Sequence, residues 1–394
     1  MAGGVVVTGM GCVCAAGTEP AAVLHGLAQR RNLRPGTDLD PRALPNPFFA
    51  VEPLCFGPAG RRHSAKDTLS LAQLAVAQAL AQAAPPLGLL RTAGVALGTT
   101  AGSALHFLEA YAASRAGADA ALAPFPHDRD DYFAANLALE LDIPAQGPRL
   151  TITDACTSGA DAVGLGLDLI RTGQCPCVVC GGADALSLVP HTGFARLMIY
   201  APDPCRPFDR NRKGLNLGEG AAALILEDEA AARSRGASIL GWAAGFGNAA
   251  DAHHFTAPHP QGRGLAAAIN AALDQAGITA ADLAFVNVHG TATKENDKVE
   301  GGVLRRLLPH VPVWASKGGT GHTLGAAGAL EAVLTLAALR AGIVPASPGF
   351  AVPDPEIGLV PTTWPQTVNS PWALSTSLGF GGGNAALILR KGDA

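Results

Sequence analysis

The chain has 394 residues, of which 48% are hydrophobic and 15% charged, so much of it must be buried in one large domain or two medium ones. Its formal net charge of −4 argues against general nucleic-acid binding. The first residues lack the basic start of a signal peptide, and no uninterrupted apolar run is long enough to span a membrane. We therefore expect a soluble, cytoplasmic protein that does not associate with membranes.

Short β-branched runs alternate with longer runs rich in alanine and leucine along the chain. The expected strands are 5–8, 95–97, 178–180, 222–226, 285–288 and 385–389. The expected helices are 69–84, 160–172, 265–276 and 328–341. This order is typical of an α/β fold whose sheets are mostly buried.

The two halves of the chain loosely repeat each other. Residues 156–166 and 322–331 both place a reactive side chain at the start of a helix of small residues, and a similar apolar strand closes each half. The pattern restarts at 239–247, so we predict one domain over 1–235 and a second over 236–394. Two such halves packed together would bring their reactive side chains to one cleft.

One cysteine and two histidines lie in turns rich in glycine and threonine. Cys156 precedes a helical pattern, and we expect the helix N-terminus to favour its thiolate form. His289 lies within 288–293 and His322 within 321–328. A cysteine can carry an acyl group as a thioester, and histidines can donate hydrogen bonds to a thioester carbonyl. Each residue alone could be structural, but the three motifs together favour acyl transfer followed by carbon–carbon bond formation.

Three further residues accompany this set. Lys317 precedes His322 by five residues and adds a positive charge, and Glu331 lies nine residues after His322, where it could hold Lys317 or orient the histidine turn. Phe380 is enclosed by glycines within 377–384, so its backbone is unusually free. Its N–H could complete an oxyanion hole, and its ring could gate a pocket.

The eight cysteines do not indicate disulfides or a metal in a chain of this size. Cys175, Cys177 and Cys180 are spaced like metal ligands, but the run ends in Gly-Gly as a buried strand would, and no histidine lies close by. We therefore predict buried thiols, no metal site and no cofactor.

With these motifs, the chain resembles the β-ketoacyl-acyl carrier protein synthases, the elongating condensing enzymes of the thiolase superfamily. The resemblance covers essentially the full chain and is carried by the segments 5–11, 154–159, 287–298, 316–328 and 377–384. It implies a duplicated thiolase-like α/β fold with five layers, αβαβα. It also implies decarboxylative Claisen condensation of malonyl-acyl carrier protein with a cysteine-bound acyl chain, in fatty acid or in polyketide or aryl polyene synthesis.

The resemblance also implies a role for each motif residue. Cys156 would accept the acyl chain, His289 and His322 would bind the malonyl thioester carbonyl, and Lys317 would support the histidines. The backbone N–H groups of Cys156 and Phe380 would form the oxyanion hole. The remaining assignments are Thr291 and Thr293 on the pantetheine arm, Gly379, Gly381 and Ala101 at the substrate, and Glu331 and Asp297 as structural acids near the site.

Some positions depart from the family's common pattern. Lys294 and Glu295 follow the second threonine, Leu378 stands where Phe is frequent, and Gly383 stands where Thr or His is frequent. Ala101 replaces a residue that is often larger, which hints at a long or bulky primer.

Carrier proteins are acidic, so the resemblance implies a basic docking patch. The candidates are Arg61, Arg62, His63 and Lys66, and Arg206, Arg210, Arg212 and Lys213. Ordinary solvated charges are the alternative for each of them. We expect a homodimer or, in a secondary pathway, a heterodimer with a chain-length-factor-like subunit.

Two other functions on the same fold agree less well with these residues. A non-catalytic chain-length factor would lack the nucleophile, whereas Cys156, His289, Lys317 and His322 are all present. A thiolase would carry a second cysteine in its C-terminal half, and no cysteine follows Cys205.

Overall fold

The computed structural model describes residues 4–29, 33–34, 36–38, 45–56, 65–101, 115, 143 and 146–392. Its large sheet contains β1 (Val5–Cys14), β4 (Gly94–Gly98), β5 (Arg149–Ile152), β6 (Cys177–Asp184), β7 (Gly220–Asp228), β8 (Gly241–Ala250), β9 (Leu283–Asn287), β10 (Val313–Trp314), β13 (Trp372–Leu378) and β14 (Gly383–Lys391). Two small sheets pair β2 (Leu33–Arg34) with β3 (Phe48–Phe49) and β11 (Ile343–Val344) with β12 (Gln366–Thr367).

The large sheet consists of two equivalent halves. The strand order is β5-β4-β6-β7-β1 in the first half and β10-β9-β13-β14-β8 in the second. In both halves the first three strands are parallel, and the last two pair antiparallel. Val6 and Val7 of β1 pair with Trp242 and Gly241 of β8, which joins the halves edge to edge. The duplication predicted from the sequence is therefore present, and the domain boundary at 235/236 stays a prediction.

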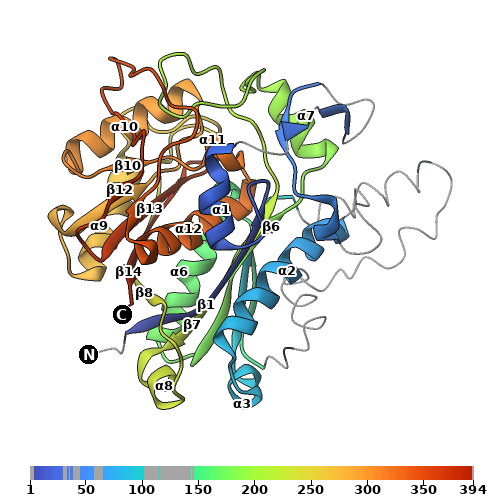
Figure 1. Cartoon of the computed structure of the whole chain (residues 1–394), viewed down its shortest axis with the longest axis vertical. Helices are drawn as coiled ribbons and strands as arrows, with labels where there is room; N and C mark the ends of the chain where they lie inside the picture. The colour runs from blue at the N-terminus through green and yellow to red at the C-terminus, as the bar shows by residue number, and fades with distance from the viewer. Residues whose placement is uncertain are drawn as a thin grey trace.

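Helices lie between the two half-sheets and on both of their outer faces (Figure 1). In the middle, α6 (Ser158–Arg171) and α12 (Ala327–Ala341) pack on each other and contact strands of both halves. Outside them, α2 (Ala65–Ala83) packs on β1 and β7, and α9 (Arg263–Ala276) packs on β8 and β14. This is the five-layered αβαβα arrangement of the thiolase-like fold, as predicted. The other helices are α1 (Pro20–Gly26), α3 (Leu87–Arg91), α7 (Leu188–Arg196), α8 (Glu229–Ser234), α10 (Lys294–Leu307) and α11 (Lys317–Thr320).

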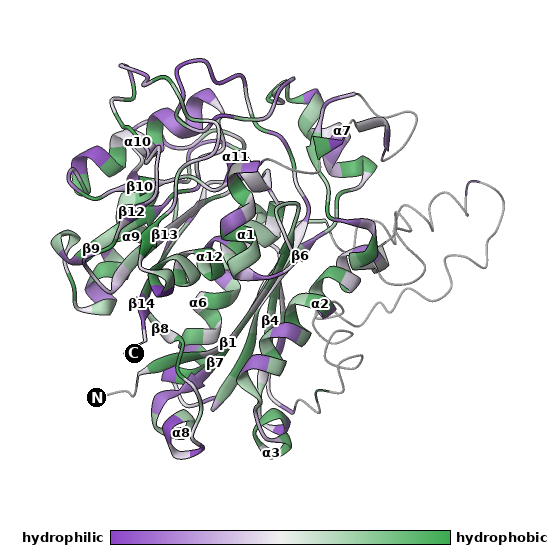
Figure 2. Cartoon of the chain, viewed as in Figure 1, coloured by the Kyte–Doolittle hydropathy of each residue, from purple (hydrophilic) through white to green (hydrophobic). Residues whose placement is uncertain are grey.

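Small residues allow the two central helices to approach closely. A Cβ atom on Gly328 would lie 2.7 Å from the Cβ of Ala160, and one on Gly159 would lie 2.8 Å from the backbone nitrogen of Ala329. Both helices are largely apolar in Figure 2. The segment Leu324–Ala341 is apolar enough to cross a membrane, but 89% of it is buried inside the fold, as in the core helix of a soluble protein.

Strand β1 is longer than the sequence predicts, because it runs on from 5–8 to Cys14. Gly9 and Gly11 lie in the part of β1 beyond the expected strand. In the fold they let the strand lie against α2, where a Cβ on either glycine would come within 2.2 Å of the carbonyl oxygens of Ala79 and Ala75. The glycines therefore serve close packing.

Candidate active site

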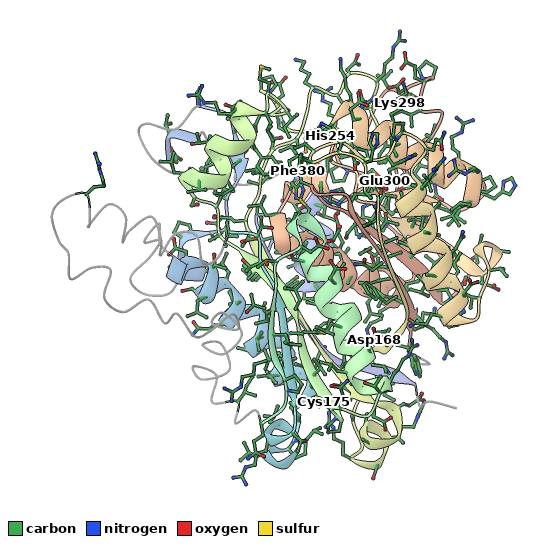
Figure 3. All side chains as sticks on the ribbon, turned by 180° about the vertical axis from the view of Figure 1, so that it is seen from behind. Asp168, Cys175, His254, Lys298, Glu300 and Phe380 are labelled. Atoms are coloured by element: carbon green, nitrogen blue, oxygen red, sulfur yellow. The ribbon has the colours of Figure 1, made fainter. Side chains whose placement is uncertain are left out.

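One cavity of about 500 Å³ collects the predicted reactive residues from both halves of the fold. Its walls include Cys156, Phe194, Leu197, Met198, Ile199, Leu215, His289, Thr291, Thr293, Asn296, His322, Leu378, Gly379, Phe380 and Asn384. Figure 3 shows Phe380 and Glu300 near one end of the molecule, whereas Asp168 of α6 and Cys175 lie toward the other. Among the residues that the structure describes, no group of three His, Cys, Asp or Glu side chains could hold a metal ion, and none of the eight cysteines forms a disulfide.

Cys156 lies in a tight turn between β5 and α6. A 3₁₀ turn, Ala155–Thr157, precedes the helix, and Ala155 adopts a φ of +46°, which is rare for a residue with a side chain. The Thr157 hydroxyl donates to the Asp154 carbonyl at 2.8 Å, and the Asp154 N–H donates to the Ser158 hydroxyl at 2.8 Å. These bonds hold the turn in the strained conformation that places the thiol at the cavity.

Cys156 is only 5% exposed, and this burial raises the pKa of its thiol to about 12. The charge of Lys317 and a hydrogen bond from the Phe380 N–H oppose the shift but are the smaller effects. This environment therefore favours the thiol over the thiolate at neutral pH. Burial opposes the expected effect of the helix end, and thiolate formation by Cys156 stays a prediction.

His289 follows β9 in a loop whose backbone is held by a buried carboxylate. The N–H groups of His289 and Gly290 each donate to Glu300 at 2.8 Å. Nζ of Lys317 lies 3.2 Å from Nδ1 of His289. Because an ammonium group can only donate, Nδ1 must accept, and the ring proton of the neutral imidazole is then on Nε2.

His322 reaches the same tautomer by a different contact. The Leu324 N–H donates to Nδ1 of His322 at 3.1 Å, so the ring proton is again on Nε2. Leu324 has a φ of +55°, a strained geometry that turns its N–H toward the ring. The two rings lie 5.2 Å apart at 87°. Burial first, and the charge of Lys317 second, lower the pKa of both histidines well below the usual value, so both are neutral at pH 7.

Lys317 and Glu331 form a buried ion pair behind the histidines. Both side chains are 2% exposed, and Nζ of Lys317 contacts the Glu331 carboxylate directly. Burial raises the pKa of Glu331 to about 7, against the opposing effect of Lys317. Nζ also donates to the carbonyl oxygen of His289 at 2.6 Å, in addition to its contact with Nδ1 of the same residue. The pair therefore fixes both the backbone and the ring of His289.

The other sequence-predicted residues are placed unevenly. Thr291, Thr293 and Gly379 line the cavity. Ala101 and Gly381 do not line it. The Ala101 N–H donates to Asp184 at 3.0 Å, and the Gly381 N–H donates to the Phe255 carbonyl at 2.7 Å. Both residues therefore contribute backbone hydrogen bonds that hold the turns beside the cavity.

Asp297 is fully buried beneath the site. Its carboxylate accepts hydrogen bonds from the N–H groups of Phe208 at 2.7 Å and Ala292 at 3.1 Å, and Nε of Arg212 lies 3.8 Å away. Burial raises the pKa of Asp297 to about 7. Asp297 thus ties the loop after His289 to the loop at 206–213, in keeping with a structural acid.

Two buried carboxylates at the site escaped sequence reasoning. Glu300 also accepts from the Thr376 hydroxyl at 2.9 Å. Asp184, at the end of β6, accepts from the hydroxyl of Thr99 and from the N–H groups of Thr100 and Gly325, all within 2.8 Å. It thereby joins the turns on the two sides of the cavity. Two features of the sequence could have indicated these carboxylates. Asp184 ends an apolar strand, and Asp297 and Glu300 are spaced three residues apart in the helix after His289.

Part of the predicted basic patch lies outside the described residues. Arg61, Arg62 and His63 lie outside the described residues, as does the side chain of Lys66. Arg206, Arg210 and Lys213 are exposed, and Lys213 pairs with Asp203. Arg212 is wrongly assigned to such a patch, because it is largely buried and binds Asp354 at 2.5 Å.

Two family models match the chain. Residues 2–232 match the beta-ketoacyl synthase N-terminal domain and residues 237–351 match its C-terminal domain. The chain therefore belongs to the β-ketoacyl synthase family, which confirms the resemblance seen in its motifs.

Individual relatives agree with this assignment. The chain is 40% identical over 278 residues to the tetracenomycin polyketide synthase ketoacyl synthase alpha subunit of Streptomyces glaucescens. The matched region covers 66% of this chain and 65% of that protein, so this chain spans slightly less than two thirds of that relative's length. It is 36% identical over 308 residues to 3-oxoacyl-[acyl-carrier-protein] synthase 2 of Mycobacterium tuberculosis, spanning 75% of this chain and 74% of that protein.

Solved structures share the whole fold. The ishigamide ketosynthase/chain length factor superposes with a TM-score of 0.89 and 31% identity over 100% of both chains. A beta-ketoacyl synthase from Burkholderia phymatum superposes with a TM-score of 0.88 and 28% identity, covering 99% of this chain and 100% of that one. A ketosynthase in complex with its chain length factor from Xenorhabdus doucetiae superposes with a TM-score of 0.78 and 29% identity, covering 99% of this chain and 98% of that one.

Proposed function

We propose that this chain is an acyltransferase that condenses a Cys156-bound acyl chain with malonyl-acyl carrier protein, giving β-ketoacyl-acyl carrier protein and CO₂. One observation carries the proposal: Cys156 and two neutral histidines line one cavity, and both histidines hold their ring proton on Nε2. A buried thiol beside two neutral donors suits thioester chemistry.

In the first half-reaction, the sulfur of Cys156 attacks the carbonyl carbon of an acyl thioester. The C–S bond to Cys156 forms, the C–S bond to the carrier's pantetheine breaks, and the thiol proton leaves with the pantetheine sulfur. The backbone N–H of Phe380, already donating to the cysteine sulfur, and that of Cys156 would stabilise the tetrahedral oxyanion.

In the second half-reaction, the malonyl thioester carbonyl accepts hydrogen bonds from Nε2 of His289 and of His322. The bond to the carboxylate breaks, CO₂ leaves, and the electron pair forms an enolate that the two donors stabilise. The enolate carbon attacks the acyl carbonyl on Cys156, and the thiolate leaves and takes up a proton. We expect His289→Ala and His322→Ala to spare acyl loading more than condensation, because these donors act on the malonyl group.

For partners, we propose an acidic acyl carrier protein and a second ketosynthase-like subunit, either a copy of this chain or a chain-length-factor-like protein. The heterodimer is supported by the similarity to two structures in which a ketosynthase is accompanied by a chain length factor. Mass photometry of the chain alone and with a co-expressed candidate subunit would separate the two assemblies. We place the protein in the cytoplasm, where carrier-protein thioesters are made.

The test is intact-protein mass spectrometry after incubation with short, long, unsaturated and aryl-primed acyl carrier protein thioesters. Wild type should gain the acyl mass and Cys156→Ala should not. Cys180→Ala, which changes another buried thiol that does not line the cavity, serves as the matched control and should load like wild type.

Cys156→Gln should retain malonyl decarboxylation, because its neutral amide resembles an acylated cysteine. Loading of Cys156→Ala at the wild-type level would refute the proposed nucleophile. No loading and no decarboxylation by wild type, alone or with its subunit, would favour a non-catalytic chain-length factor.

A further inference from the structure

Asn216 is a fully buried polar residue that none of the site motifs contains. Its side chain makes three hydrogen bonds. Oδ1 accepts from the Cys205 N–H at 2.6 Å, and Nδ2 donates to the carbonyl oxygens of Ala201 at 3.1 Å and Pro47 at 3.2 Å. A buried amide of this kind ties the loop 201–205 and the segment at Pro47 to the strand-like segment that carries Asn216.

The backbone of the same residue holds His322. The His322 N–H donates to the Asn216 carbonyl at 2.8 Å, and the Gly218 N–H donates back to the His322 carbonyl at 2.9 Å. This is a short parallel bridge between Leu217 and His322. Because one residue carries both the carbonyl and the buried amide, the position of His322 depends on the side-chain contacts of Asn216.

A second connection runs from Asn216 toward Lys317. Cys205, whose N–H is bound by Asn216, donates its thiol to the Lys317 carbonyl at 3.3 Å. Lys317 in turn contacts the ring of His289. Asn216 is therefore linked to His322 through backbone hydrogen bonds. It is linked to Lys317, which orients His289, through Cys205.

We propose that Asn216 is a positioning residue that sets the direction in which Nε2 of His322 faces the cavity and that steadies Lys317 through Cys205. This inference rests on the proposed function and adds a residue to it from outside the motifs. Asn216 does not line the cavity, so it acts through these neighbours. Replacement by an apolar side chain would remove a partner of the buried Cys205 N–H, of the buried Ala201 carbonyl and of the part-buried Pro47 carbonyl, and loss of a partner by a buried polar group costs more than the hydrogen bond itself contributes.

The experiment compares Asn216→Val with wild type in the full chain, together with any subunit that it requires. Acyl transfer to Cys156 is followed by intact mass, with the donor that loads wild type best, and decarboxylation is followed as conversion of malonyl- to acetyl-carrier protein. We expect decarboxylation to fall about tenfold or more, the effect of about one lost hydrogen bond on the barrier, while loading changes by less than about threefold.

Thr8→Val is the matched control, because Thr8 is equally buried, donates to Glu227 and does not line the cavity. It should lower the Tm and leave both half-reactions near wild type. Equal loss of both half-reactions in Asn216→Val, or decarboxylation within twofold of wild type in the folded variant, would refute a positioning role.

If Asn216→Val does not fold, Cys205→Ala decides the question, since it removes the thiol contact with Lys317 and keeps the Cys205 N–H that donates to Asn216. Decarboxylation lowered about threefold or more with loading retained would support the inference, and unchanged decarboxylation would overturn it. Failure of the proposed function is distinguishable, because wild type would then show neither half-reaction.

Discussion

The ammonium group of Lys317 lies 3.2 Å from Nδ1 of His289 and 2.6 Å from the carbonyl oxygen of the same residue. The first contact fixes the tautomer of the ring, and the second fixes the backbone that carries it. Burial, and after it the positive charge of Lys317, lower the pKa of His289, so the ring stays a neutral donor. Lys317 therefore leaves Nε2 of His289 protonated and available to donate a hydrogen bond into the cavity.

Breaking the buried pair of Lys317 and Glu331 should be costly. Lys317→Met leaves the Glu331 carboxylate buried without its partner, and we expect the free energy of unfolding to fall by about 3 kcal/mol or more in urea denaturation. Burial raises the pKa of Glu331, and protonation relieves the penalty, so the loss should be larger at pH 9 than at pH 6. Adding Glu331→Gln should recover most of the stability; a double variant as unstable as the single one would contradict this account.

The ionisation of Cys156 can be measured by alkylation. Burial raises the pKa of the thiol to about 12, so the thiolate fraction should increase about tenfold for each pH unit between 7 and 9. Iodoacetamide labelling, located by peptide mass spectrometry, should therefore accelerate in this range without a plateau. A plateau near pH 7 would mean that the helix end and Lys317 have already produced the thiolate.

The exposed arginines near 206–213 should act on carrier-protein binding. Arg206→Ala and Arg210→Ala should each raise the KM for malonyl-carrier protein about two- to fivefold at low salt with kcat unchanged, and the effect should fade at 0.5 M NaCl. Arg212→Ala is the informative comparison, because its buried contact with Asp354 predicts a lower Tm. An unchanged KM in both exposed variants would show that the carrier docks elsewhere.

The crossing of α6 and α12 requires a glycine at position 328. Gly328→Ala would place its Cβ 2.7 Å from that of Ala160, and we expect a loss of about 1–3 kcal/mol in stability as the helices separate. Gly302→Ala, in α10 with no atom within 4 Å of the new Cβ, should leave stability unchanged or raise it by up to about 1 kcal/mol. Equal Tm shifts in the two variants would argue against the packing explanation.

Sequence reasoning found the residues that stand in recognisable turns. Cys156, His289 and His322 each follow or precede small residues that let a reactive side chain reach a cavity, and this pattern is local. Glu300 and Asp184 could not be found in the same way, because their partners are backbone N–H groups of distant turns. A backbone group leaves no trace in residue identity.

The sequence by itself determined the alternation of strands and helices, the duplication, and the choice of Cys156, His289 and His322 as candidate site residues, because these depend on local patterns of size and polarity. Only the tertiary structure decided their chemical state. Burial raises the pKa of the Cys156 thiol, and Lys317 and the Leu324 N–H direct the histidine protons to Nε2. Solvation and hydrogen-bond direction depend on what surrounds a group in space, and segments far apart in the chain supply those surroundings.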